Sequence, residues 1–276
     1  MEIFNKEITE QFSKKLRKNI LDMSLVAGAA SSHFGGALSI IDVIAVLFKN
    51  VIDFNKENFK ESSRDRFVLS KGHACMALYS VLYELDIINN KELLSFEKSD
   101  SILLGHPVKN IEKGIELSTG SLGMGLSISM GMALGMKKKK YLSKVYSVIG
   151  DGECNEGAIW EVAISAPKFN LDNFCVILDR NNFQQTGSSK EILDINPLKD
   201  KWRSFNWDVY EIDGHDHFEI YKSLSVISKK PKLIIANTIK GKGFSFSENN
   251  NDWHHKILTQ EQFEIAINEL GLNEDR

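Results

Sequence analysis

Apolar residues in the first part of the chain recur at helical spacing. Each lies four positions after the one before, on one helical face: Ile8, Phe12, Leu16 and Ile20. We therefore expect a helical segment within residues 1–27. Continuous apolar stretches predict two buried helices, at 37–48 and 74–85, and a short strand is expected at 67–69.

From residue 122 onward, helical and strand patterns alternate. Helices are predicted at 122–136 and 156–168, and strands at 145–149, 174–178, 207–212 and 233–238. The last three strands are apolar runs without alternation, a pattern typical of strands buried on both faces of a parallel sheet. We therefore predict an α/β fold, a doubly wound, mostly parallel sheet flanked by helices. One domain is expected over residues 1–276, closing with a helix at 259–270 that has Thr259 as its N-cap and Gln262 three residues on.

Composition and charge narrow the class of protein. A hydrophobic fraction of 42% with 26% charged residues is typical of a globular chain that can bury a core. The net charge of -3 favours neither nucleic acid nor an anionic membrane as a partner. No apolar run approaches the roughly 20 residues of a membrane-spanning helix. The three cysteines, Cys75, Cys154 and Cys175, form no CxxC pair, which favours reduced thiols and a cytoplasmic location.

Polar residues follow two of the predicted strands at the point where each strand ends. Gly150-Asp151-Gly152 comes directly after the strand at 145–149, and Asn181-Asn182 follows the strand at 174–178. If these strands are adjacent and parallel, the carboxylate and the carboxamide lie side by side at one sheet edge, where α/β proteins bind ligands. Glycines there let backbone N–H groups approach a phosphate, and the helix near Glu156 could direct its positive end at the same anion.

Oxygen ligands of this kind suit Mg²⁺. Each turn alone is common at strand ends, but the pair, separated by a complete helix, is a stronger signal. Gly-Asp-Gly followed by Asn-Asn after an intervening strand resembles the thiamine-diphosphate fold signature. The resemblance implies that Asp151, Asn181 and the backbone oxygen of Phe183 bind a divalent cation, Mg²⁺ or another such as Ca²⁺ or Mn²⁺, which holds the diphosphate of thiamine diphosphate.

Histidine-containing loops decide between the subfamilies that share this signature. Five segments resemble transketolase motifs in the family's order: Ser32–Gly35, Leu69–Ala74, Gly105–Pro107, Ser118–Gly123 and Trp253–His254. The resemblance implies catalytic roles for His33 and His254 at the C3 hydroxyl of a ketose and for His106 at the ketol hydroxyl. It also implies that the cofactor is bound by His73, Gly120, Leu122, Gly150, Asp151, Gly152, Glu156, Asn181 and His254.

The implied function is that of a transketolase-type transferase, which moves a two-carbon ketol unit between sugars. In full-length transketolases a second domain carries the glutamate that activates the cofactor, and this sequence stops after the first. We therefore expect the chain to be the N-terminal subunit of a split enzyme, in an α₂β₂ assembly with a C-terminal subunit that carries the pyrimidine-binding domain. By the same resemblance, Glu156 either lies near that interface and links to this glutamate, or is an ordinary acid of the first helical turn.

Three other interpretations stay open at this point. They are the α subunit of a 2-oxo acid dehydrogenase, a deoxyxylulose-phosphate synthase-like enzyme, and a non-catalytic subunit that holds the cofactor. The sequence departs from the transketolase pattern at Ser32, Ser121, Met124, Asn182 and His255, where the family has other residues. These departures bear on the donor and acceptor sugars. His215, His217 and His255 have no predicted role, and Asp216 is expected to be a helix N-cap.

Overall fold

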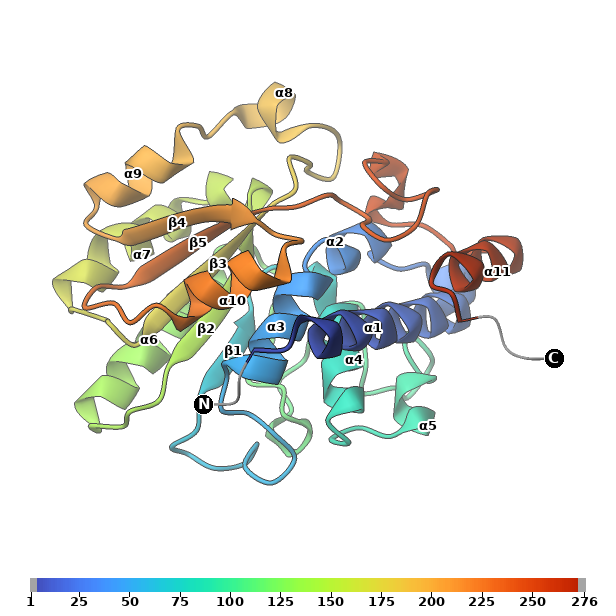
Figure 1. Cartoon of the computed structure of the whole chain (residues 1–276), viewed down its shortest axis with the longest axis horizontal. Helices are drawn as coiled ribbons and strands as arrows, with labels where there is room; N and C mark the ends of the chain where they lie inside the picture. Colours follow the sequence, from blue (N-terminus) through green and yellow to red (C-terminus); the bar gives the residue numbers. More distant parts are fainter. Residues whose placement is uncertain (1–3, 273–276) are drawn as a thin grey trace.

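The computed structural model describes residues 4–272 and is built around one parallel sheet (Figure 1). Its five strands lie in the order β1-β2-β3-β5-β4. They are β1 (Arg66–Leu69), β2 (Val145–Gly150), β3 (Phe174–Arg180), β4 (Asp208–Asp213) and β5 (Lys232–Asn237). Every neighbouring pair is parallel, which confirms the predicted doubly wound α/β fold.

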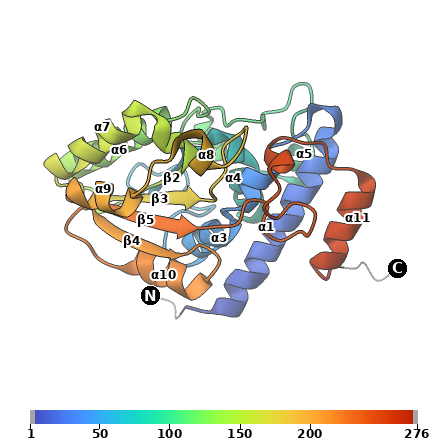
Figure 2. The same cartoon turned by 90° about the horizontal axis from the view of Figure 1, so that it is seen from above.

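Helices cover both faces of the sheet, and each face has its own apolar core (Figure 2). One core contains residues of α1 (Lys6–Ala27), α2 (Phe34–Leu38), α3 (Ile41–Asn50), α4 (Cys75–Glu84), α5 (Asn90–Leu93), α10 (His217–Ser225) and α11 (Gln260–Glu269). The other contains residues of α6 (Met124–Lys138), α7 (Gly157–Lys168) and α9 (Leu198–Ser204). The remaining α-helix is α8 (Ser189–Leu193), and short 3₁₀ helices lie at Gly28–Ala30, Gly72–Ala74, Ile111–Lys113, Gly152–Asn155 and Asn251–His254.

The central strands are largely apolar because their alternate side chains enter different cores. In β2, Val145 and Ile149 pack with α6 and α7, whereas Tyr146 and Val148 face the core that contains α1. The strand expected at 207–212 differs from this pattern, because β4 lies at the sheet edge, where only Val209 is buried and the other strand residues are partly or fully exposed. No helix within residues 4–272 combines the length and the apolar character needed to cross a bilayer.

The single helix expected at 37–48 is two helices, α2 and α3, with a break at Ser39 and Ile40. The Ser39 hydroxyl lies 3.1 Å from the Gly36 carbonyl oxygen and 2.6 Å from the carboxylate of Asp179. Such a side-chain bond competes with helix continuation. The helix expected at 259–270 is α11, and Thr259 and Gln262 form its predicted capping box.

Two glycines near the start of α6 allow close packing. A Cβ atom at Gly125 would lie 2.6 Å from the Ser70 hydroxyl, so only glycine fits where α6 passes the end of β1. Gly123 has φ 81° and is the N-cap of α6. Farther along, a Cβ at Gly131 would meet no atom of residues 4–272 within 4 Å, so that part of the helix faces open space.

Candidate active site

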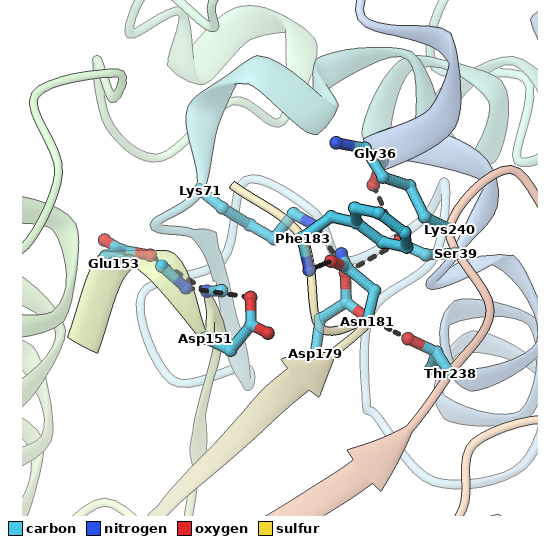
Figure 3. A network of polar contacts seen from close by, with 12 residues as sticks. Gly36, Ser39, Lys71, Asp151, Glu153, Asp179, Asn181, Phe183, Thr238 and Lys240 are labelled. Atoms are coloured by element: carbon cyan, nitrogen blue, oxygen red, sulfur yellow. Dashed lines mark hydrogen bonds and ion pairs between the residues drawn. The ribbon is translucent and has the colours of Figure 1, made fainter. Parts of the chain in front are cut away.

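The carboxyl ends of the strands bring the polar motifs together. Gly150 pairs with Asp179 in the register of β2 and β3, so Asp151 and Asn181 emerge at the same sheet edge. Figure 3 shows both side chains there, with Lys71 reaching toward Asp179 from the segment after β1. The structure thus places the carboxylate and the carboxamide directly after neighbouring strands, as the sequence predicts.

A cavity of about 310 Å³ lies at this edge. It is lined by His33, Lys71, His73, His106, Gly120, Leu122, Gly150, Asp151, Gly152, Glu153, Asn181, Phe183, Gln184, Gln185 and His254. Every residue predicted to act in catalysis, cofactor binding or metal binding is in this lining except Glu156. That glutamate is exposed and is the N-cap of α7, outside the cavity wall.

Histidines from three other segments meet around His33. Its ring centroid lies 5.5 Å from His73, 5.4 Å from His106 and 5.5 Å from His254. The structure adds His255, whose ring lies 4.4 Å from His33 and whose Nδ1 lies 2.9 Å from the Ser31 hydroxyl. A backbone bridge between Ser32 and Lys256 holds the two loops side by side.

Burial determines the charge of these imidazoles. It lowers the pKa of His33 to about 3, assisted by the neighbouring His255 and His254. The pKa of His254 falls to about 4, through burial and the charge of Lys240. Burial and the charge of Lys71 hold the pKa of His73 well below its usual value. At neutral pH these rings are therefore uncharged and can exchange protons or hydrogen bonds with a substrate.

Asp151 is a buried carboxylate that the protein positions through hydrogen bonds. Its Oδ1 accepts from the Gly152 amide at 2.8 Å, and its Oδ2 accepts from the Asn182 amide at 2.8 Å and the Ser189 hydroxyl at 3.1 Å. Burial and the negative charge of Asp179 raise the pKa of Asp151 from 3.8 to about 6. Within residues 4–272, positive groups therefore balance the negative charge of Asp151 only in part.

Asp179 joins three of the strand ends. It accepts hydrogen bonds from Ser39, Thr238 and the Asn181 amide, and forms a buried ion pair with Lys71. Burial opposes ionisation of Asp179, but Lys71 and the hydroxyl donors lower its pKa below the usual value. The Asn181 amide nitrogen points to Asp179 at 2.9 Å, which fixes the orientation of the carboxamide (Figure 3).

Glu153 ties the Gly-Asp-Gly turn to its neighbours. Its carboxylate accepts from the Ser70 hydroxyl at 2.6 Å, the Gly123 amide at 2.8 Å and the Gly150 amide at 3.1 Å. These bonds connect the ends of β1 and β2 with the start of α6. Burial raises the pKa of Glu153 even though these donors act against the rise.

Lys240 reaches the other side of the histidine cluster from the segment after β5. Its ammonium donates to the Asn251 side chain at 2.6 Å, to Nδ1 of His254 at 3.0 Å and to the Gln184 carbonyl at 3.3 Å. An ammonium can only donate, so Nδ1 of His254 is the acceptor and the neutral ring carries its proton on Nε2. Burial and Lys71 lower the pKa of Lys240 to about 8.

The chemistry of the wall fits a diphosphate held through a divalent cation. Asp151 and Glu153 of the wall, and Asp179 behind it, are at most 4% exposed, and Lys71 already pairs with Asp179. The Gln184 amide nitrogen in the same wall is buried and has no partner within the described residues. No group of three His, Cys, Asp or Glu side chains in that part of the chain could hold a metal alone. A cation here therefore needs amide and carbonyl oxygens and oxygens of its ligand.

Comparison with known proteins decides the family. The family profile described as "Transketolase, thiamine diphosphate binding domain" matches residues 9–276. The chain belongs to this transketolase family. Its cofactor is accordingly thiamine diphosphate, and its activity is that of a transketolase-type transferase.

Among the transketolase relatives are separate subunits of similar length. The chain is 39% identical over 268 residues to a subunit of the apulose-4-phosphate transketolase of Phocaeicola vulgatus, covering 96% of this chain and 94% of that protein. It is 40% identical over 241 residues to a 6-deoxy-6-sulfo-D-fructose transketolase subunit of a Clostridium species, covering 86% and 88%. These relatives favour a transketolase subunit over the 2-oxo acid dehydrogenase, synthase-like and non-catalytic alternatives.

A solved transketolase structure supports the family assignment. The chain superposes on transketolase from Campylobacter jejuni with a TM-score of 0.89 at 33% identity. The match covers 97% of this chain but 43% of that transketolase. The chain therefore spans less than half the length of the solved enzyme and almost the whole length of the subunit from Phocaeicola vulgatus.

Several residues of the site are absent from the sequence-based set: Lys71, Glu153, Asp179, Lys240 and His255. Lys71 lies within the segment 69–74, and Asp179 directly follows the strand predicted at 174–178. A charged residue at the end of an apolar strand is a signal that could have identified both. Glu153 follows the Gly-Asp-Gly turn directly. Lys240 has no local signal, because it reaches His254 and Gln184 of the cavity wall only through the placement of β5 beside β3.

Proposed function

We propose that this chain is the diphosphate-binding subunit of a two-subunit transketolase, with residues 1–276 acting as one domain. It transfers a two-carbon ketol unit from a ketose to an aldose. The observation that carries the proposal is the meeting of Asp151 and Asn181 with four histidines around one cavity. The chemistry that thiamine diphosphate supplies when bound is an electron sink for cleavage of the C2–C3 bond.

The cation role falls to Asp151, Asn181 and the backbone oxygen of Phe183. Mg²⁺ suits these oxygen ligands, and Ca²⁺ or Mn²⁺ could take its place. Hydrogen bonds hold both side chains, Asp151 and Asn181, in place before the cation binds. Little side-chain freedom is therefore lost when the cation binds. Around the cofactor, contacts come from His73, Gly120, Leu122, Gly150, Gly152 and His254.

The acid–base work falls to the neutral histidines. His33 accepts the proton of the C3 hydroxyl, and His254 directs the N–H of its Nε2 at a substrate oxygen. His106, at the exposed side of the cluster, binds the ketol hydroxyl. Placed acid–base groups of this kind typically contribute about 10²–10⁴ in rate.

A second subunit completes the site. Its expected contribution is the pyrimidine-binding domain and a glutamate, in an α₂β₂ assembly within the cytoplasm. The subunit names of the relatives support the existence of a second subunit. Met124 on α6 and Ile164 on α7 are 50% and 58% exposed, and Glu156 lies at the start of α7. We assign the exposed surface of α6 and α7 to the partner subunit, with Glu156 near the glutamate of that subunit.

The proposed donors are ketoses with a terminal anionic group. The names of the two subunit relatives specify a sugar phosphate and a sulfonated sugar, which share a terminal anion and a ketol end. The departure at His255 lies beside His33, where this exposed ring would contact the sugar beyond its ketol carbons. Ser32 is buried and its hydroxyl bonds to Ser24, so it would act only by positioning the loop. A panel of phosphorylated, sulfonated and neutral ketoses separates these possibilities.

The test is reconstitution with the C-terminal subunit, thiamine diphosphate and Mg²⁺. We expect ketol transfer by the complex, none by the purified single chain, and its loss in the complex when Asp151→Ala is introduced. The control is Asp172→Ala, which removes an exposed carboxylate outside the cavity lining. Ketol transfer by the single chain would refute the split arrangement, and full activity of Asp151→Ala in the complex would refute the catalytic assignment.

A further inference from the structure

Two histidines outside the cavity share one buried carboxylate. His215 lies in the loop after β4 and His217 at the start of α10, and both contact Asp42 of α3. Asp42 is 5% exposed and accepts two hydrogen bonds from the Arg17 guanidinium, at 2.9 and 2.8 Å. Burial opposes its ionisation, but Arg17, His215 and His217 hold the pKa of Asp42 well below the usual value. The group is therefore a fixed anion.

His215 connects this anion to a segment of the active site. Its Nδ1 lies 2.8 Å from Oδ2 of Asp42, and its Nε2 lies 2.9 Å from the backbone nitrogen of Ile239. The amide of Ile239 can only donate, so Nε2 must be the acceptor. Nδ1 then carries the proton and donates it to Asp42. Only one neutral tautomer satisfies both contacts.

The segment 239–242 carries Lys240 and is held at several points. Besides the bond from Ile239 to His215, the Gly241 amide donates to the Gly35 carbonyl at 3.0 Å. Arg17 also reaches the segment, through a hydrogen bond from its Nε to the Lys242 carbonyl at 3.3 Å. Asp42 therefore acts on the segment by two routes, one through Arg17 and one through His215.

The position of Lys240 determines which ring nitrogen of His254 carries the proton. Its ammonium is 3.0 Å from Nδ1 of His254, which leaves the proton of the neutral imidazole on Nε2. Lys240 is 1% exposed, so its aliphatic chain has little freedom, and the location of its ammonium follows the backbone at Ile239 and Gly241. A displaced backbone would move the ammonium from His254.

We propose that His215 is a positioning residue: by accepting the Ile239 amide, it holds Lys240 against His254 and so fixes the proton-bearing nitrogen of His254. The role rests on the proposed function in that His254 serves the substrate. His217 provides the contrast, since it contacts the same Asp42 and the Thr9 hydroxyl at 2.7 Å but makes no hydrogen bond to the segment.

Two isosteric variants separate the nitrogens of His215. In His215→Gln the side-chain amide can reach the Nε2 position and accept from Ile239, whereas in His215→Asn it reaches only the Nδ1 position and can still bond Asp42. His217→Asn is the matched control, because it alters the other histidine of the Asp42 group. Thermal unfolding confirms that each full-length variant folds.

The first readout is amide hydrogen exchange of the segment 239–242 in the full chain without cofactor, and the second is the ¹⁵N shift of the His254 ring. We expect about tenfold faster exchange and loss of the Nε2–H tautomer in His215→Asn, with near wild-type behaviour in His215→Gln and His217→Asn. In the reconstituted enzyme, kcat of His215→Asn should fall about tenfold with little change in KM.

Equal effects of His215→Asn and His215→Gln, or the same loss in His217→Asn, would overturn the proposal. The histidines at Asp42 would then only stabilise the fold. Unchanged exchange in all variants would overturn it as well. These readouts need no turnover. A reconstituted wild-type enzyme without ketol transfer would therefore count against the proposed function alone, while the exchange data would still decide the role of His215.

Discussion

Replacement of Asp151 by asparagine should stabilise the chain in the absence of cofactor and metal. The pKa of Asp151 rises from 3.8 to about 6 through burial and the charge of Asp179. Since a tenfold change in proton affinity corresponds to about 1.4 kcal/mol, the ionised carboxylate costs the folded chain about 3 kcal/mol at neutral pH. Asparagine removes this cost. It loses about 1 kcal/mol in return, because its amide nitrogen cannot accept from a backbone N–H.

The net expectation is a gain of about 2 kcal/mol at pH 7. The sign follows from proton binding: between pH 3.8 and about 6 the folded state holds more protons at Asp151 than the unfolded state. Stability therefore falls as pH rises through this window. Below it both states are protonated, so the advantage of the variant should disappear.

Urea unfolding with a chelator present, at pH 7 and at a pH below 3.8, measures both quantities. Asp179→Asn is the matched control, because it leaves Lys71 buried without its partner and should cost about 3–5 kcal/mol. Binding of thiamine diphosphate with Mg²⁺ by Asp151→Asn should weaken by at least about a hundredfold. A variant that is no more stable than wild type at pH 7, or equally favoured at both pH values, would refute the reasoning.

Three further outcomes are expected. Gly120→Ala should lower stability by about 1–3 kcal/mol and reduce kcat/KM, because Gly120 has φ 140° and a Cβ would lie 2.7 Å from His106; a fully active variant would contradict this. In α6, Gly125→Ala should destabilise the chain while Gly131→Ala stabilises it by up to about 1 kcal/mol, which urea unfolding can compare; equal effects would count against the packing argument. Burial lowers the pKa of His33 to about 3, so its ring signals in an NMR titration should stay those of the neutral form down to pH 5, and a midpoint near 6.5 would disprove the assignment.

The sequence predicts the central sheet well because burial on both faces leaves a local signature. β2 and β3 are apolar runs followed by turn residues, and this was sufficient to place Asp151 and Asn181 at one edge. The break before α3 could not be predicted in this way. It depends on Ser39 bonding to Asp179, which lies 140 positions away in the chain.

Charged residues of the site show the same limit. Neither Lys71 nor Asp179 stands out in the sequence. Their role becomes visible only in the fold, where the packing of β1 to β3 buries both side chains and they form an ion pair. The histidine loops were recognised through their resemblance to transketolase motifs, whereas His215 and Lys240 carry no such signal. Their connection runs through a backbone amide, which any residue at position 239 other than proline would provide.

The bridge between the loops of His33 and His255 has a consequence for biosynthesis. Ser31 and His255 are 224 positions apart, so the ribosome must translate everything between them before the two loops can meet. The sheet core around β2 and β3 can condense earlier, since chains emerge amino end first. A polypeptide that ends before His254 would thus lack two of the five clustered histidines, His254 and His255, even where its sheet core has already formed.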